Sequence, residues 1–101
     1  MARGPRIVWA APALDELDEI AAFIADGDPR AAAGLVHRVF ASLERLRRFP
    51  ASGRRLPELP NGPYREVIVA PCRIIYRTDR AVVHIVHVTR GERPLRPHQL
   101  K

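Results

Sequence analysis

The chain has 101 residues, a length that suits one domain and leaves little room for a second core. Apolar residues make up 47%, which argues against general disorder, and the formal net charge of +6 favours a polyanionic partner, either nucleic acid or an acidic protein. One cysteine, Cys72, excludes an intrachain disulfide. Residues 1–5 lack an apolar core of signal-peptide length, and no apolar run reaches the length of a membrane span. We expect a cytoplasmic single domain over residues 1–101 with loose ends at 1–5 and 94–101 and no membrane partner.

The first half of the chain predicts a strand and two helices. A short strand is expected at Arg6–Ala10, which reads RIVWA. The first helix stops near Gly27, and its apolar residues, at three- and four-residue spacing, are Leu14, Leu17, Ile20, Ala21 and Ile24. Asp28 followed by Pro29 starts a second helix, which Phe49–Pro50 closes. Its apolar stripe is Ala32, Val36, Val39, Phe40, Leu43 and Leu46. So short a connection makes the helices an antiparallel hairpin.

The second half predicts a loop and three strands. Residues 51–63 hold three prolines and two glycines, which indicates a surface loop, with Leu56 and Leu59 as inward anchors. Strands are expected at 65–70, 72–78 and 81–89, with a tight connection at Asp79–Arg80 between the last two. The order β-α-α-β-β-β indicates an α+β fold, in which an antiparallel sheet is covered on one face by the helical hairpin.

Alternation along the strands divides their side chains between two faces. The residues expected beneath the helices are Cys72, Ile74, Tyr76, Val83 and Ile85, with Val88 added if a bulge shifts the phase of the last strand. We expect Cys72 to be a packed thiol and not a nucleophile. The opposite side carries arginine, and the residues that could form one positive surface are Arg65, Arg73, Arg77, Arg90, Arg93 and Arg96. The alternative is that these arginines are solvated or paired with the acids of the same chain.

Candidates for bond-breaking chemistry are few. RNA cleavage through the 2′-hydroxyl needs a base, an acid and cations at the phosphate. His84 or His87 could be the base. Arg73 and Arg77 could hold the phosphate, whereas Tyr76 is expected to face the core. Since the two histidines lie three apart on a strand, they point to opposite faces and could not easily share a metal ion. We expect no metal site and no cofactor.

An ordered series of short segments resembles the ParE branch of the RelE/ParE superfamily of bacterial toxin-antitoxin toxins over Ile7–Arg93. The matching pieces are Ala13…Leu17…Ile20, Asp28-Pro29 with Ala32-Ala33, Leu43…Leu46…Phe49-Pro50…Gly53-Arg54, Pro57-Glu58-Leu59, Tyr64-Arg65-Glu66, Arg73-Ile74-Ile75-Tyr76-Arg77, Val83-His84-Ile85…Val88 and Arg90-Gly91-Glu92-Arg93. The resemblance implies a compact toxin that an antitoxin encoded beside it neutralises by direct binding.

Within the superfamily, ParE-type members act on DNA gyrase and RelE-type members cut messenger RNA on the ribosome. The long hairpin and the lack of the C-terminal tyrosine common in RelE-type nucleases favour the ParE branch. Arg90-Gly91 stands where many relatives have His-Gly, which removes a candidate acid-base group. The resemblance therefore implies a gyrase inhibitor that is not an enzyme. A ribosome-dependent endoribonuclease and an interaction module without toxicity are the alternatives, and direct nucleic-acid binding is left open.

The partners follow from the resemblance and from the charge. ParD-like antitoxins are usually acidic and partly disordered, so a cationic sheet edge and an apolar groove beside the hairpin would suit one. The residues expected to bind the antitoxin are Leu17, Ile24, Val36, Arg73 and Arg77. Those expected to bind the target, DNA gyrase, are Arg65, Arg73, Arg77, Arg90 and Arg93.

Overall fold

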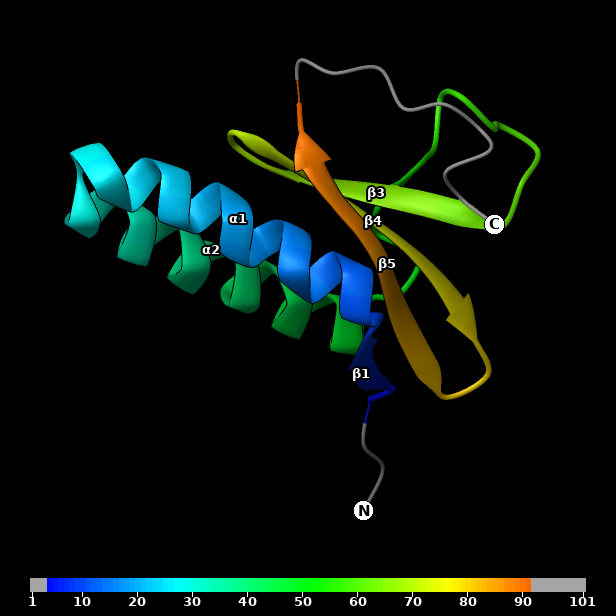
Figure 1. Ribbon diagram of the computed structural model, residues 1–101. Helices are drawn as coiled ribbons and strands as arrows, with labels where there is room; N and C mark the ends of the chain where they lie inside the picture. Colours follow the sequence, from blue (N-terminus) through cyan, green and yellow to red (C-terminus); the bar gives the residue numbers. More distant parts are fainter. Residues whose placement is uncertain (1–3, 92–101) are drawn as a thin grey trace.

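A five-stranded sheet and a helical hairpin form two layers in the computed structural model, which describes residues 4–91 (Figure 1). In chain order the elements are β1 (Arg6–Trp9), α1 (Ala11–Gly27), α2 (Pro29–Arg48), β2 (Arg54–Arg55), β3 (Tyr64–Val69), β4 (Cys72–Asp79) and β5 (Val82–Arg90). The α+β class and the helices on one face of the sheet are as predicted.

The expected loose end at 94–101 lies outside the described residues. Near the other end, Arg47 Nε donates to the Pro5 carbonyl at 3.2 Å, which holds Pro5 against α2.

The two helices begin where the sequence signals lie. Pro12 falls in the first turn of α1, where a missing N–H costs nothing. The Asp28 side chain accepts from the Ala31 N–H at 3.1 Å and caps α2. The two helices pack against each other, α1 also lies on β5, and α2 also lies on β3. The turn between them projects beyond the edge of the sheet (Figure 1).

The sheet differs from the prediction in two ways. Its order is β1-β5-β4-β3-β2, and β1 pairs with β5 in parallel, so the sheet is mixed and not purely antiparallel. In addition, Arg54–Arg55 forms the short strand β2 on the edge of β3, within the segment expected to be loop. Alternation identifies a strand but not its neighbour, and a two-residue strand has no period to detect.

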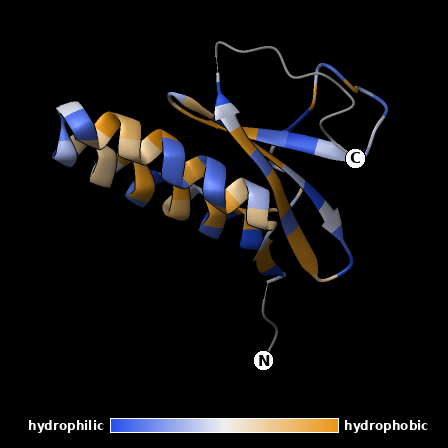
Figure 2. Cartoon of the chain, in the orientation of Figure 1, coloured by the Kyte–Doolittle hydropathy of each residue, from blue (hydrophilic) through white to orange (hydrophobic). Residues whose placement is uncertain are grey.

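A bulge sets the phase of the last strand, as expected. Ile75 pairs with His87 whereas Tyr76 pairs with Ile85, so one extra residue is accommodated on β5. Val88 therefore reaches the core beneath the helices and is 1% exposed. The other members expected there are all buried: Cys72, Ile74, Tyr76, Val83 and Ile85. Figure 2 shows β5 as apolar along most of its length, whereas both helices alternate between apolar and polar residues.

The opposite face of the sheet carries a second, smaller core. Leu56 and Ile75 are completely buried there, and Leu59, Tyr64 and Val86 pack against them. The Pro-rich connection between β2 and β3 thus covers part of the face that was expected to be open to solvent. Leu56 and Leu59 are its anchors, as the sequence indicated.

Candidate partner-binding surfaces

Four charged side chains form a cluster on the sheet face opposite the helices. The Glu66 side chain is fully buried, and its two oxygens accept from Arg73 Nε at 2.7 Å and from Arg54 Nε. The two terminal nitrogens of Arg73 donate to the two carboxylate oxygens of Glu58 at 2.8 and 2.9 Å. This bidentate pair ties the loop that follows β2 to the centre of the sheet.

The expectation that Arg73 faces solvent is wrong. The residue is only 6% exposed, and carboxylates of the same chain take up its guanidinium donors. The hydrogen bonds to Glu58 are the largest cause that raises the pKa of Arg73 above its ordinary value; burial opposes them and Glu66 adds to them. Arg73 therefore stabilises the fold and has no free donor fork for a target, an antitoxin or a phosphate.

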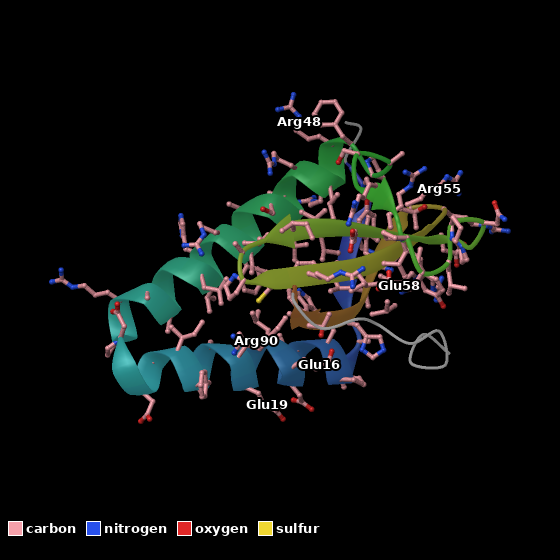
Figure 3. The ribbon with its side chains drawn as sticks, turned by 90° about the horizontal axis from the view of Figure 1, so that it is seen from above. Glu16, Glu19, Arg48, Arg55, Glu58 and Arg90 are labelled. Atoms are coloured by element: carbon pink, nitrogen blue, oxygen red, sulfur yellow. The ribbon has the colours of Figure 1, made fainter. Side chains whose placement is uncertain are left out.

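The predicted single positive surface is divided. Arg65 is the cross-strand partner of Tyr76 on the helix side of the sheet, and its Nη1 donates to the Gly53 carbonyl at 2.8 Å. Arg90 also lies on the helix side, with its guanidinium 5.9 Å from the centre of the Phe23 ring (Figure 3). Arg77 is half-buried on the opposite side. The remaining two candidates, Arg93 and Arg96, lie outside the described residues.

A different group of arginines lies exposed where α2 ends and β2 begins. Its members are Arg45, Arg48, Arg54 and Arg55. Arg48 and Arg55 point away from the sheet in Figure 3, and Phe49 beside them is 59% exposed. The sequence placed basic residues at this helix end, where they favour the negative end of the helix dipole, and showed a further arginine pair in the segment that follows. It did not show that this pair forms β2 and lies beside the helix end.

Of the four residues named for a nuclease, the structure brings two together. Arg77 and His84 are direct cross-strand partners on β4 and β5. His87 lies elsewhere, with Nδ1 at 3.2 Å from both Glu16 oxygens, and Glu16 also accepts from the Val88 N–H at 2.9 Å. Arg73, the fourth, forms ion pairs with Glu58 and Glu66 in the buried cluster. This arrangement does not place a base and two phosphate-binding cations around one point.

Tyr76 is buried, as the sequence indicated, and it has a structural role. Its hydroxyl accepts from the Gly53 N–H at 2.9 Å and donates to the Pro50 carbonyl at 2.8 Å. These bonds tie the turn after α2 to the sheet. Burial is the main cause that raises the pKa of Tyr76 above its ordinary value. The hydroxyl is thus engaged within the fold and does not open onto a surface.

The residues expected to bind an antitoxin on the hairpin differ in exposure. Leu17 is 2% exposed in the main core, so it offers almost no surface to a partner. Ile24 and Val36 are half-buried in the part of the hairpin near its projecting turn. Phe23, which the sequence did not single out, is 72% exposed beside Ile24. This end of the hairpin therefore keeps apolar surface that a partner could cover.

A groove runs beside the hairpin, between α2 and the edge of β3. Its larger hollow, about 810 Å³, is lined by Arg38, Ala41, Ser42, Arg45, Ile68, Val69 and Ala70. A second hollow of about 430 Å³ shares Ser42, Arg45 and Ile68 and continues toward Phe49 and Arg54. Ile68 is 56% exposed. A groove beside the hairpin was expected, but its residues were missed, because they depend on which strand forms the sheet edge.

Comparison with known proteins assigns this arrangement to a family. The sequence pattern of the ParE toxin of type II toxin-antitoxin systems, parDE, matches residues 7–95. The chain belongs to the ParE toxin family. It is 42% identical over 81 residues to a candidate toxin, Y4kP, of Sinorhizobium fredii, a match that covers 76% of this chain and 79% of the relative. The resemblance noted in the sequence is confirmed.

A solved structure shares the fold of this ParE-family chain. A protein of the chromosomal ParDE toxin-antitoxin system from P. aeruginosa superposes with a TM-score of 0.73, over 87% of this chain and 97% of that one. The two sequences are 19% identical, so the likeness shows the fold alone. Within residues 4–91, no helix is long and apolar enough to cross a membrane, and no group of three or more histidine, cysteine or acidic side chains could hold a metal ion.

Proposed function

We propose that this chain is the toxin of a type II toxin-antitoxin pair, that it inhibits DNA gyrase in the cytoplasm without acting as an enzyme, and that a ParD-like antitoxin neutralises it by direct binding. The observation that carries the proposal is the match of the ParE family over residues 7–95. The net charge of +6 supports a function that depends on binding a negatively charged partner.

The positions of the basic residues support binding more than catalysis. Arg73 is held by Glu58 and Glu66, and His87 lies against Glu16 of α1, so neither is placed to act on a phosphate beside Arg77. The expected target contacts that remain are Arg65, Arg77 and Arg90, with Arg93 added from the end of the chain. Among these, Arg77 is the sharpest candidate, because it lies on the sheet face that the hairpin leaves uncovered.

We place the antitoxin on the hairpin and in the groove beside it. Ile24, Val36 and Phe23 offer apolar surface near the projecting turn. Arg38 and Arg45 are exposed along the groove and complement an acidic segment. A partner that covers both areas would bury apolar surface and bring negative charge to this side of α2.

Induction of the chain in bacterial cells, with and without the product of the neighbouring reading frame, tests the proposal. We expect covalent gyrase–DNA complexes to accumulate, the neighbouring product to prevent them, and Arg77→Glu to reduce them about tenfold or more. Arg30→Glu is the matched control in cells without the neighbouring product, since Arg30 is exposed at the end of α2 away from Arg77 and should leave the amount of gyrase–DNA complex unchanged. Normal growth and unbroken DNA at full expression would contradict the proposal.

The second candidate function is a ribosome-dependent endoribonuclease. One observation favours it, namely that Arg77 and His84 are direct cross-strand partners and could act on one phosphate. It predicts cleaved translated messages, no gyrase–DNA complexes, and loss of both toxicity and cleavage in His84→Ala. The same induction experiment therefore separates the two functions.

A further inference from the structure

We propose that the antitoxin joins the sheet as an added strand along β3, pairing with the backbone of Ile68, through a segment that alternates acidic, apolar and acidic residues. The inference rests on the proposed function and adds how and where the partner is held. Three features support it: the backbone of Ile68 on the edge of β3, the end of β2 before that residue, and the arginines Arg38 and Arg45 beside it.

Alternate residues of β3 turn their backbone groups away from β4. The Tyr64 carbonyl accepts from the Leu56 N–H at 3.2 Å, and the Glu66 carbonyl faces Gly53, so both point to the β2 side. Past the end of the strand, the Ala70 carbonyl accepts from Arg38 Nη2 at 3.0 Å, on the same side. Because this direction repeats every second residue, the N–H and the carbonyl of Ile68 also point there.

The neighbouring strand ends before it reaches Ile68. β2 pairs only with Arg65 and Glu66, and within residues 4–91 no strand continues along the β2 side of β3 beyond that point. The Ile68 N–H and carbonyl therefore open into the groove between β3 and α2. An unpaired donor and acceptor on an edge form a template for one more strand.

The side chains around this edge define the chemistry of the added strand. A residue directly opposite Ile68 lies on the same face as the Ile68 side chain, which is 56% exposed, so an apolar residue fits there. The residues before and after it face α2, where Arg38 and Arg45 line the groove. No acidic residue lines this larger hollow, so carboxylates of the partner would meet cations without competition from this chain.

A second copy of this chain is a poorer occupant of the edge. Each copy carries a net charge of +6, and edge-to-edge pairing would bring the arginines beside Ile68 of one copy toward those of the other. Like charges that meet in this way oppose association. An acidic segment removes this repulsion and replaces it with attraction.

Amide hydrogen exchange at Ile68 tests the inference, with the purified chain and the product of its neighbouring reading frame. We expect exchange at Ile68 to slow about tenfold or more in the complex, because the N–H gains a partner. Ile68→Pro removes this outward N–H, a change that edge strands tolerate, and should weaken binding about tenfold. Ile68→Val, which keeps the N–H and the branched side chain, is the matched control and should bind as the parent does.

The outcomes separate this inference from the proposed function. A tight complex in which Ile68 exchange is unchanged, and in which Ile68→Pro binds like Ile68→Val, overturns the added strand and leaves the toxin-antitoxin function standing. An Ile68 amide already protected in the free chain, together with a dimer in solution, overturns it in favour of a second copy. Failure to form any complex overturns the inference and the antitoxin part of the proposed function together.

Discussion

At Arg73, a guanidinium meets two carboxylates of its own chain in a site with almost no access to water. Replacing Arg73 with Met leaves the buried Glu66 carboxylate without its closest buried partner. We expect the free energy of unfolding to fall by about 3–5 kcal/mol, as is typical when one member of a buried pair is removed. Urea denaturation measures this change.

The control for this change is Arg77→Met on the same strand. Arg77 is half-buried and lies outside the cluster, so its loss should cost less than about 1 kcal/mol. If the two variants are equally stable, the assignment of Arg73 to the fold is wrong, and a role for it in binding the target has to be reconsidered.

Tyr76 makes stability depend on pH in the alkaline range. Burial raises its pKa in the folded chain above the ordinary value of 10.0, so above that pH the unfolded chain loses a proton that the folded chain keeps. The contribution of Tyr76 to the free energy of unfolding is therefore fully present below pH 10.0 and is lost as the pH rises through the folded pKa. Tyr76→Phe should cost about 1–3 kcal/mol at neutral pH, because the Gly53 N–H and the Pro50 carbonyl lose their partner.

Unfolding midpoints measured from about pH 8 to about pH 11 check both effects. The parent should lose more stability than Tyr76→Phe over this range, so the difference between them should shrink as the pH rises. A constant difference across the range would contradict a raised pKa at Tyr76.

Two glycines make a matched pair at the scale of the elements. A Cβ at Gly53 would lie 2.5 Å from the Tyr76 hydroxyl and 2.7 Å from the Glu66 carbonyl, so the turn between α2 and β2 would have to move. Gly53→Ala should therefore lower the free energy of unfolding by about 1–3 kcal/mol. Gly27→Ala, at the end of α1 with no atom within 4 Å of the new Cβ, should raise it by up to about 1 kcal/mol. Thermal or urea denaturation of both variants measures these changes. Equal changes in the free energy of unfolding would contradict the close packing of the turn around Gly53.

Elements with a strong internal period were predictable from the sequence. The spacing of the apolar residues, the Asp28-Pro29 start and the alternation along Cys72–Thr78 led to the two helices and to the face of the sheet that they cover. The parallel pairing of β1 with β5 was not predictable, because it depends on which edge the first strand joins. The two-residue strand β2 was also missed, and with it the point at which the edge of β3 becomes open.

The candidate site was less predictable than the fold. Alternation placed Arg73 and Arg77 on one face, but it could not show that the loop holding Glu58 would fold over that face and bury only Arg73. Leu17 belongs to the apolar stripe of α1, yet the stripe does not tell which members the sheet covers and which the projecting turn leaves half-open. Both questions are decided by contacts between residues far apart in the chain.

At the scale of the whole molecule, charge is distributed unevenly between the two helices. The exposed acids Asp15, Asp18 and Glu19 lie on α1, whereas the end of α2 and β2 carry the exposed arginine group. The proposed antitoxin therefore approaches along α2 and the β3 edge, while Arg77 remains available to the target on the opposite face of the sheet. On this proposal, the antitoxin blocks the target by its size or by changing the shape of the toxin, and the two proteins do not need to bind the same arginine.

Supercoiling of relaxed DNA by purified gyrase and ATP, measured against increasing amounts of the folded chain, tests the central claim most directly. We predict that supercoiling stops as the chain is added, that it resumes when the product of the neighbouring reading frame is added in equal amount, and that messenger RNA on ribosomes stays intact. Unchanged supercoiling at saturating concentrations of the folded chain would contradict the claim.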